Sequence, residues 1–232
     1  MIDLTGFKDK LSKDPEAIKL FEQKPYLEAY SLNTDDRIEK DGPHLAVGST
    51  DGTITDWETH GDLQLHFLKC RGLKPDSTLL DLGCGTGRLA RKAVKFLDDG
   101  HYTGVDISVK ALEQCEELAK KEKWIRKNPK FILGNGNIPE GQFNYIWAHS
   151  VFTHTPIDIA EKILREISTR EYKEFIFTYK KSDQDNYKRI GLRQFMYNPY
   201  HLIALGEKCG VKLEPLSVSL PGGQWVMVCR SA

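Results

Sequence analysis

Three glycines and two aspartates are spaced in a way that could bind a nucleoside. The segment Thr78-Leu-Leu-Asp-Leu-Gly-Cys-Gly-Thr-Gly-Arg88 places an apolar run and an acid before three glycines at alternate positions. Nineteen residues beyond the last glycine, a second apolar run ends in Asp106. Glycines let a backbone approach a ligand closely, and a carboxylate at a strand tip accepts hydrogen bonds from both ribose hydroxyls. The pattern predicts a strand, a glycine loop, a helix and a second strand that form half of a nucleoside-binding site.

The elements that must position these residues alternate between strands and helices from residue 62 onward. Such alternation is typical of the α/β class, with a mostly parallel sheet and helices on both faces. The last two strands are joined by Ser-Leu-Pro-Gly-Gly-Gln, which favours an antiparallel hairpin. Ser108, Thr155 and Asn198 are expected to begin helices. The predicted strands are 78–82, 102–105, 130–133, 143–147, 174–178, 211–216 and 225–229, and the predicted helices are 62–71, 88–97, 108–121, 156–167 and 199–210.

Residues 1–60 differ from the rest and are predicted to form an N-terminal helical and loop cap. We expect helices over 14–23 and 26–30, then a loop rich in Gly, Asp, Ser and Thr over 33–55. Gly72 stands where a residue in the left-handed conformation would end the predicted helix 62–71. Residues 61–232 would then form the second unit, which carries the glycine loop.

Composition excludes several classes of function. Lysine plus arginine and aspartate plus glutamate both number 33, so the formal net charge of the 232-residue chain is zero. We therefore do not expect nucleic acid to be the main partner, because such binding relies on a basic face. The five scattered cysteines favour reduced thiols in a cytoplasmic protein and offer no metal-ligand spacing. No stretch approaches about 18 consecutive apolar residues, so we expect no membrane association. The oligomeric state is left open.

The motifs resemble those of class I S-adenosylmethionine-dependent methyltransferases, over about residues 62–230. The most specific parts are Leu79-Leu-Asp-Leu-Gly-Cys-Gly-Thr-Gly-Arg-Leu and Gly104-Val-Asp-Ile-Ser, with support from Phe143-Asn-Tyr-Ile-Trp-Ala-His-Ser-Val-Phe-Thr-His. A dehydrogenase fingerprint would place glycine where the chain has Arg88, and no P-loop motif is present. The resemblance implies a Rossmann-like seven-stranded sheet with a terminal antiparallel β-hairpin. It also implies S-adenosyl-L-methionine as the cofactor.

The resemblance assigns the glycine loop to the methionine part of the cofactor. Asp81 would bind the cofactor ammonium or hold the loop through backbone N–H groups. Gly83, Cys84 and Gly85 would let the methionine portion lie against the main chain, with Cys84 as a small filler rather than a nucleophile. Arg88 would either reach the methionine carboxylate or stay in solvent.

The resemblance also assigns the adenosine part of the cofactor. Asp106 would accept hydrogen bonds from the ribose diol, and Ile107 would pack on the adenine face. After the third strand, Asn135 would read the adenine amino edge, assisted by the backbone of Gly136 or the side chain of Asn137. An interpretation of the two asparagines as turn residues is equally open.

Two histidines stand where the resemblance places the methyl group. His154, just before a helix, is the candidate general base or substrate contact, and the alternative is that Thr153-His154-Thr155 organises the helix start. His149, at the tip of the fourth strand, is the second catalytic candidate and is expected to line the cofactor cleft. A hydroxyl acceptor gains from such a base, typically about 10²–10⁴-fold. No metal site is expected, because the carboxylate and amide oxygens that a metal needs are absent beside His149 and Ser150.

The expected reaction is methyl transfer to a hydroxyl or amine of a small polar molecule, such as a sugar or a natural-product intermediate. Residues 1–60 are expected to fold over the cleft as a lid, and an insertion over 180–200 carries three tyrosines and five basic residues beside it. Two alternatives stay open. One is a methyltransferase acting on protein or RNA, and the other is a non-catalytic S-adenosylmethionine-binding partner subunit.

Overall fold

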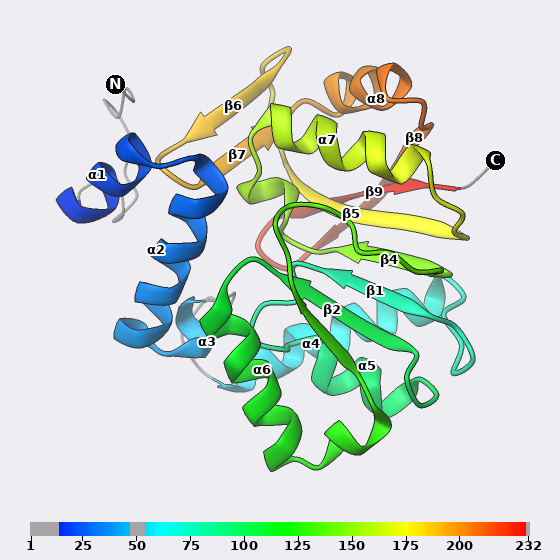
Figure 1. Cartoon of the computed structure of the whole chain (residues 1–232). Coiled ribbons are helices and arrows are strands. Elements are labelled where there is room, and N and C mark those ends of the chain that lie inside the picture. The colour runs from blue at the N-terminus through cyan, green and yellow to red at the C-terminus, as the bar shows by residue number, and fades with distance from the viewer. Residues whose placement is uncertain (1–13, 47–53, 231–232) are drawn as a thin grey trace.

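A mixed β-sheet of nine strands forms the centre of the computed structural model, which describes residues 14–46 and 54–230 (Figure 1). The strands are β1 (Leu79–Leu82), β2 (Tyr102–Asp106), β3 (Lys130–Leu133), β4 (Tyr145–Ala148), β5 (Glu174–Lys181), β6 (Tyr187–Ile190), β7 (Gln194–Tyr197), β8 (Leu213–Leu220) and β9 (Gln224–Cys229). The first five are parallel, in the order β3-β2-β1-β4-β5. β9 pairs antiparallel with β5 and forms a hairpin with β8.

The α/β class, the parallel centre and the C-terminal antiparallel hairpin are confirmed, but the expected number of seven strands is wrong. The two additional strands, β6 and β7, lie in the insertion over 180–200. β7 runs along β5 beyond the end of β4 and pairs Lys180 with Met196. Phe195 and Tyr197, alternate residues of β7, are buried. This apolar face lets a highly charged segment pair as strands.

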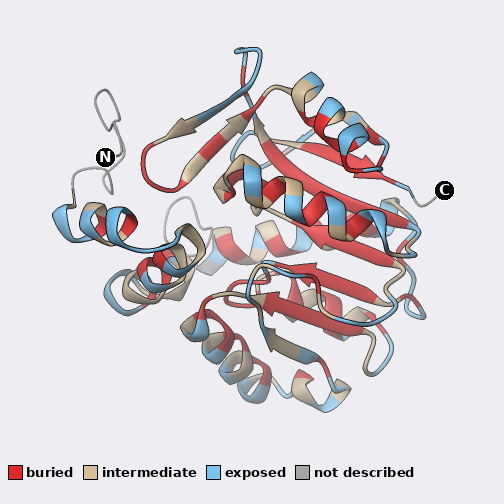
Figure 2. Cartoon of the chain, turned by 45° about the horizontal axis from the view of Figure 1, so that its top comes forward, coloured by how far each residue is buried: buried red, intermediate tan, exposed pale blue. Residues whose placement is uncertain are grey.

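Helices lie on both faces of the sheet, as expected (Figure 1). They are α1 (Pro15–Gln23), α2 (Tyr26–Asp41), α3 (Pro43–Ala46), α4 (Ile54–Cys70), α5 (Ala90–Phe96), α6 (Val109–Lys121), α7 (Ile157–Ser168) and α8 (Pro199–Lys208), with short 3-10 helices η2 (Trp124–Lys127) and η3 (Phe152–His154). One face packs on α7 and α8 through residues such as Leu80 and Ile146, and the other packs on α4, α5 and α6 through Leu79 and Trp147. Because successive side chains point to opposite faces, β1 and β4 are buried on both sides (Figure 2).

Local capping signals locate several helix ends. The side chains of Ser108 and Asn198 each accept a backbone N–H at the start of α6 and α8, and Gly72, with φ of +98°, follows α4. These three predictions are confirmed. The prediction that Thr155 caps α7 is wrong, because its hydroxyl donates to a carbonyl of the preceding turn and Pro156 occupies the cap position.

The predicted loop over 33–55 is wrong in its described parts, since α2 continues to Asp41, α3 follows, and α4 already begins at Ile54. Residues 47–53 lie outside the described residues. The polar segment after residue 32 shows little helical periodicity, but Asn33 and Thr34 are buried by tertiary packing. Lys40 and Asp36 add an ion pair one turn apart, with Nζ and Oδ1 separated by 2.9 Å. α4 runs without a break across residues 60 and 61, where we expected one unit to give way to the next.

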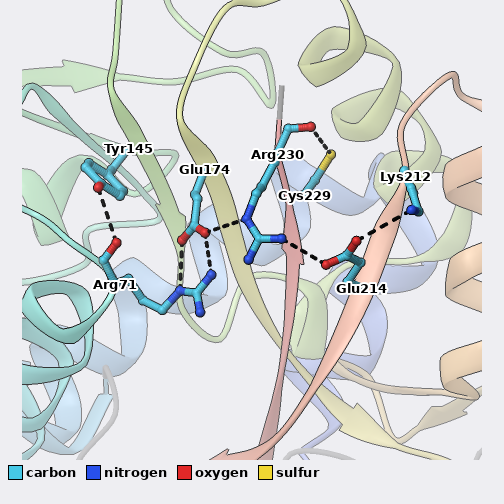
Figure 3. Close-up of polar contacts among 7 residues, drawn as sticks. All are labelled: Arg71, Tyr145, Glu174, Lys212, Glu214, Cys229 and Arg230. Atoms are coloured by element: carbon cyan, nitrogen blue, oxygen red, sulfur yellow. Dashed lines mark hydrogen bonds and ion pairs between the residues drawn. The ribbon is translucent and has the colours of Figure 1, made fainter. Parts of the chain in front are cut away.

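A network of ion pairs connects several elements at the end of the sheet where β5 begins (Figure 3). Glu174, at the start of β5, has a side chain only 10% exposed and lies between two guanidinium groups. Arg71 Nε donates to its Oε2 over 2.9 Å, and Arg230 Nε donates to its Oε1 over 3.1 Å. Arg230 also pairs with Glu214 at 3.0 Å, and the Tyr145 hydroxyl donates to the Arg71 carbonyl. The network joins the end of α4 to β5, β8 and β9.

The substitution Glu174→Gln should destabilise the protein by about 1–3 kcal/mol, since it leaves two guanidinium groups without their shared anion. The free energy of unfolding in urea measures this effect. Glu214→Gln is the matched control, because its side chain is 44% exposed, against 10% for Glu174, and its loss should change stability by less than about 1 kcal/mol. Equal effects of the two substitutions would contradict the central place of Glu174.

Candidate active site

A cavity of about 820 Å³ opens at the carboxyl ends of β1, β2 and β4. β1 lies between β2 and β4, and open α/β sheets bind ligands where the strand order reverses in this way. Helix α2 and the turn between β6 and β7 complete the wall, and Figure 1 shows both at one end of the strands. The lining includes Asp81, Gly83, Cys84, Gly85, Asp106, Ile107, Gly136, Asn137, His149 and His154 from the sequence-based site.

The glycine loop presents bare backbone to this cavity. Gly83 and Gly85 have φ of +77° and +56°, in the left-handed region that favours glycine. The amides of Gly83 and Cys84 both donate to the Val105 carbonyl, over 2.7 and 3.0 Å, which ties the loop to the end of β2. A Cβ on Gly83 would stand 2.6 Å from Val151 Cγ2 in the loop after β4. The first glycine is therefore required by loop-against-loop packing as well as by access to the cavity.

Cys84 and Gly87 have packing roles. The Cys84 side chain is buried, and burial raises the pKa of its thiol well above the usual range. A thiol with a raised pKa is a poor nucleophile, which agrees with a filler role. A Cβ on Gly87 would stand 2.6 Å from Cys115 Sγ on α6. The third glycine thus allows α6 to approach the loop.

Asp81 is a buried carboxyl group at the end of β1. Its Oδ2 accepts a 2.7 Å hydrogen bond from the Tyr102 hydroxyl. Burial raises the pKa of the Asp81 carboxyl to about 7, while the Tyr102 hydrogen bond and the charge of Arg88 act in the opposite direction. The cavity therefore holds a carboxyl group that a cationic ligand would convert fully to its charged form.

Asp106 is held by backbone donors at the end of β2. Its Oδ2 accepts from Gly85 N over 2.8 Å and its Oδ1 from Ser108 N over 2.9 Å. Each carboxylate oxygen has further acceptor capacity, so a fixed carboxylate faces the cavity with both oxygens able to accept again. The neighbouring Ile107 lines the cavity too, and its carbonyl accepts from the Ser31 hydroxyl of α2 over 2.7 Å.

The loop after β3 reaches the cavity only in part. Gly136 and Asn137 line it, whereas Asn135 is exposed and lies outside the lining. Asn135 Oδ1 accepts from the Asn137 amide over 3.2 Å, as in a turn. A Cβ on Gly136 would stand 2.6 Å from Leu27 Cδ1, so α2 packs directly on this loop. The structure does not bring Asn135 to the other site residues.

His149 is fixed by a hydrogen-bond network at the end of β4. Its Nδ1 lies 3.1 Å from Thr178 Oγ1, whose single proton is donated to Gln224 Oε1. Nδ1 must therefore carry the proton of the neutral ring, leaving a lone pair on Nε2. Burial lowers the pKa of His149 well below its usual value, with Arg88 acting in the same direction. Ser150, with φ of +66°, is held by the same network, which restrains an uncommon backbone conformation beside the cavity.

His154 lies toward the other end of the cavity. Its Nδ1 is 2.7 Å from the Arg193 carbonyl, which can only accept, so Nδ1 carries the proton and Nε2 the lone pair. Burial, followed by the charge of Arg193, lowers the pKa of His154 to about 3. The ring is therefore neutral at physiological pH. The turn itself is organised by hydroxyls of Thr153 and Thr155, so the His154 side chain is not required to cap it.

Several lining residues were missed by sequence reasoning. Gln64 of α4 is buried, and its Oε1 accepts from Trp147 Nε1 over 3.1 Å while its Nε2 has no partner. Its position four residues before the buried Leu68 marks a polar residue on the inward face. The neighbouring apolar residue Leu63 is 41% exposed and does not face the core. The sequence predicted that residues 1–60 and 180–200 lie over or beside the cleft, but it did not show which residues of α2 and of the β6–β7 turn line the cavity, because only tertiary packing brings them to the strand ends.

The lining residues fit the cofactor that the sequence motifs imply. The unpartnered Gln64 Nε2 is a buried donor suited to a carboxylate, and Arg88 lines the same region. Asp81 offers a carboxyl group for an ammonium, and Asp106 offers acceptors for hydroxyls. The positive-φ backbone of the glycine loop leaves room between them. Within residues 14–46 and 54–230, no three His, Cys, Asp or Glu side chains are grouped to hold a metal ion.

A family model described as a methyltransferase domain matches residues 73–217 of the chain. An uncharacterized methyltransferase of Schizosaccharomyces pombe is 29% identical over 111 residues, which cover 45% of this chain and 39% of that protein. The chain spans between 23% and 39% of the length of the first curated relatives it matches. The relatives are named for acceptors as different as sterols and a ribosomal protein.

Solved structures share the fold at low sequence identity. Magnesium protoporphyrin IX methyltransferase of Synechocystis PCC 6803 with bound SAM has a TM-score of 0.71 and 12% identity, covering 90% of this chain and 98% of that chain. A second solved structure is the Burkholderia thailandensis 1,6-didemethyltoxoflavin-N1-methyltransferase with bound 1,6-didemethyltoxoflavin and S-adenosylhomocysteine. It has a TM-score of 0.62 and 16% identity, and the match covers 90% of this chain and 91% of that chain. The family model matches more than half of the chain, and these folds agree with it. The chain therefore belongs to the methyltransferase domain family, whose cofactor is S-adenosylmethionine.

Proposed function

We propose that this protein transfers a methyl group from S-adenosylmethionine to a hydroxyl or amine of a small polar molecule, such as a sugar or a natural-product intermediate. The observation that carries the proposal is one continuous cavity, with the two carboxyl groups at the ends of β1 and β2 and with His154 on its lining. A volume of about 820 Å³ lies within the range of small-molecule sites, roughly 300–1,000 Å³.

The cofactor end of the cavity holds the carboxyl groups of Asp81 and Asp106 together with Arg88. Asp81 supports binding of the methionine ammonium, Asp106 supports binding of the ribose hydroxyls, and Gln64 Nε2 supports binding of the carboxylate. Gly136, Asn137 and Ile107 stand where the adenine would lie, and Asn135 would need to turn toward the cavity to contact it. When bound, the cofactor supplies an electrophilic methyl group on a sulfonium.

The chain's own residues then align the acceptor, exclude water and take a proton. Good alignment alone contributes about 7–11 kcal/mol to a reaction of this kind. A hydroxyl that attacks the methyl carbon becomes a strongly acidic oxonium, so even the weak base His154 can accept its proton at Nε2. An amine that attacks becomes an ammonium too weakly acidic for this base, so its proton would pass to solvent. His149, with Arg88 as a neighbouring charge, belongs to the cofactor end in this proposal.

The N-terminal helices support a closed acceptor pocket. Ser31 of α2 donates to the Ile107 carbonyl, and Asp35 accepts from the Ser108 hydroxyl over 2.5 Å. We infer that these helices act as the cap expected over residues 1–60. A polymer would have to displace this cap, which favours a small acceptor over protein or RNA.

A cytoplasmic location is the last part of the proposal. None of the helices described is long and apolar enough to cross a membrane. All five cysteines are free, and four of them are buried. Unpaired thiols of this kind are typical of a reducing compartment.

The direct test uses purified protein, S-adenosylmethionine with a labelled methyl group and a panel of small hydroxyl and amine compounds. Label should pass to a small molecule, and S-adenosylhomocysteine should bind in calorimetry. Transfer only to protein or RNA from a cell extract would support that alternative, and binding without transfer to any of them would support the partner-subunit alternative. Failure to bind S-adenosylhomocysteine would contradict the cofactor site.

Cofactor affinity should rise with pH through about 7, the pKa of Asp81. Below this pH the carboxyl is protonated and cannot pair with the ligand ammonium, and above it the ion pair forms. Calorimetric titration should show S-adenosylhomocysteine binding about tenfold more tightly at pH 8 than at pH 6. Asp81→Asn should weaken binding at pH 8 and flatten the profile, whereas the exposed control Asp62→Asn should keep it. A steep profile retained in Asp81→Asn would refute the assignment.

The substitution His154→Ala should lower kcat about 10²–10³-fold for a hydroxyl acceptor, because a proton acceptor is lost. The affinity for S-adenosylhomocysteine should stay within about twofold, and His66→Ala, on the exposed face of α4, should leave both values unchanged. Since the pKa of His154 is about 3, the wild-type kcat should show no histidine inflection between pH 5 and 8 at saturating cofactor. An unchanged kcat in His154→Ala would remove this residue from the reaction.

A further inference from the structure

Arg193, in the turn between β6 and β7, is a buried cation on the lining of the cavity. Only 4% of the residue is exposed. Its Nη1 donates to Asn33 Oδ1 over 2.8 Å and its Nη2 to Thr34 Oγ1 over 3.3 Å. The guanidinium carbon also lies 4.2 Å from the centre of the Tyr30 ring. All three of these partners are uncharged groups of α2.

This arrangement differs from that of five other arginines in the described part of the chain. Arg71, Arg91, Arg165, Arg170 and Arg230 each lie within ion-pair distance of a carboxylate. Within the described ranges, no carboxylate lies within such a distance of Arg193. An isolated buried charge is unfavourable by several kcal/mol unless an anion accompanies it. The contacts to Asn33 and Thr34 use two of the five guanidinium N–H donors, so donors remain for a ligand.

A second cation lies on the same cavity. Lys180, near the end of β5, lines it and is only partly exposed. No carboxylate in the described part of the chain forms an ion pair with it. Acidic side chains do line the α2 side of the cavity, but Asp36 pairs with Lys40 at 2.9 Å and Asp41 with Arg37 at 3.8 Å. The positive charge of Arg193 and Lys180 is thus left for something that enters the cavity.

From these contacts we propose that the methyl acceptor carries an anionic group, a carboxylate or a phosphate, which binds to the guanidinium of Arg193 with Lys180 nearby. This inference rests on the proposed function and narrows its substrate class. The planar guanidinium matches the two oxygens of either anion, and Asn33, Thr34 and Tyr30 hold it in place before the ligand arrives. The anion would lie on the same side of the cavity as His154, whose Nδ1 is held by the Arg193 carbonyl. The hydroxyl or amine to be methylated would then be presented to the His154 ring.

The proximity of these charges to His154 agrees with the proposal. Apart from burial, the charges of Arg193, Lys180 and Arg37 all lower the pKa of His154. An anion bound beside Arg193 would oppose that field. The ring would then be a better proton acceptor when an anionic acceptor is present than in the empty cavity.

The test measures binding of two simple anions, inorganic phosphate and acetate, to the protein saturated with S-adenosylhomocysteine. Calorimetry at constant ionic strength should show saturable millimolar binding of at least one, and the better ligand distinguishes phosphate from carboxylate chemistry. Arg193→Gln should weaken binding of that anion by about tenfold or more, and Lys180→Met by a smaller factor. Lys181→Met is the matched control, because that exposed side chain packs over Trp225 outside the cavity lining.

Two outcomes would overturn the proposal. One is the absence of saturable binding of either anion, and the other is equal affinity in the wild type, Arg193→Gln and Lys180→Met. If Arg193→Gln fails to fold because α2 loses its contacts, Lys180→Met against Lys181→Met decides. Binding of S-adenosylhomocysteine is measured in every variant. Its loss in the wild type would defeat the proposed function itself, whereas its retention without anion binding would defeat only the anionic acceptor.

Discussion

The parallel pairing of β1 with β2 on one side and β4 on the other is the constraint on which the site depends. Asp81 pairs in register with Gly104 of β2 and with Trp147 of β4. The carboxyl ends of these three neighbouring strands therefore lie side by side. The loops that leave these strands then pack against one another, as Gly83 does against Val151. Residues separated by more than sixty positions in sequence thereby become walls of one cavity.

Charge is distributed along that cavity in a way that matches its proposed ligands. The carboxyl groups of Asp81 and Asp106 stand at the strand ends, and burial raises the pKa of both. The cations Arg193 and Lys180 stand toward α2 and the β6–β7 turn. Buried charges need partners, and a protein that leaves opposite charges at the two ends of one cavity is suited to a cationic group at one end and an anionic group at the other.

The sequence allowed accurate prediction wherever a local signal was sufficient. The cavity is lined by ten of the eleven predicted site residues, among them Asp81, Asp106 and His149. Asn135 is the exception, because an asparagine beside glycines serves a turn as readily as a ligand. The errors over 33–46 and in the number of strands share one cause. Polar segments such as α2 and β6–β7 take their conformation from packing on distant elements, and their own periodicity is weak.

The sequence by itself determined the family, the glycine loop and the two acids, because these depend on residue types at short spacings along adjacent elements. It also determined the caps at Ser108 and Asn198, where the side chain accepts a hydrogen bond from a backbone N–H in the first turn of the helix that it precedes. Only the tertiary structure decided that Gln64 and Arg193 border the same cavity as His154. Their proximity arises from long-range burial, which brings Arg193 to Asn33 across 160 positions of the chain, and no local pattern encodes it.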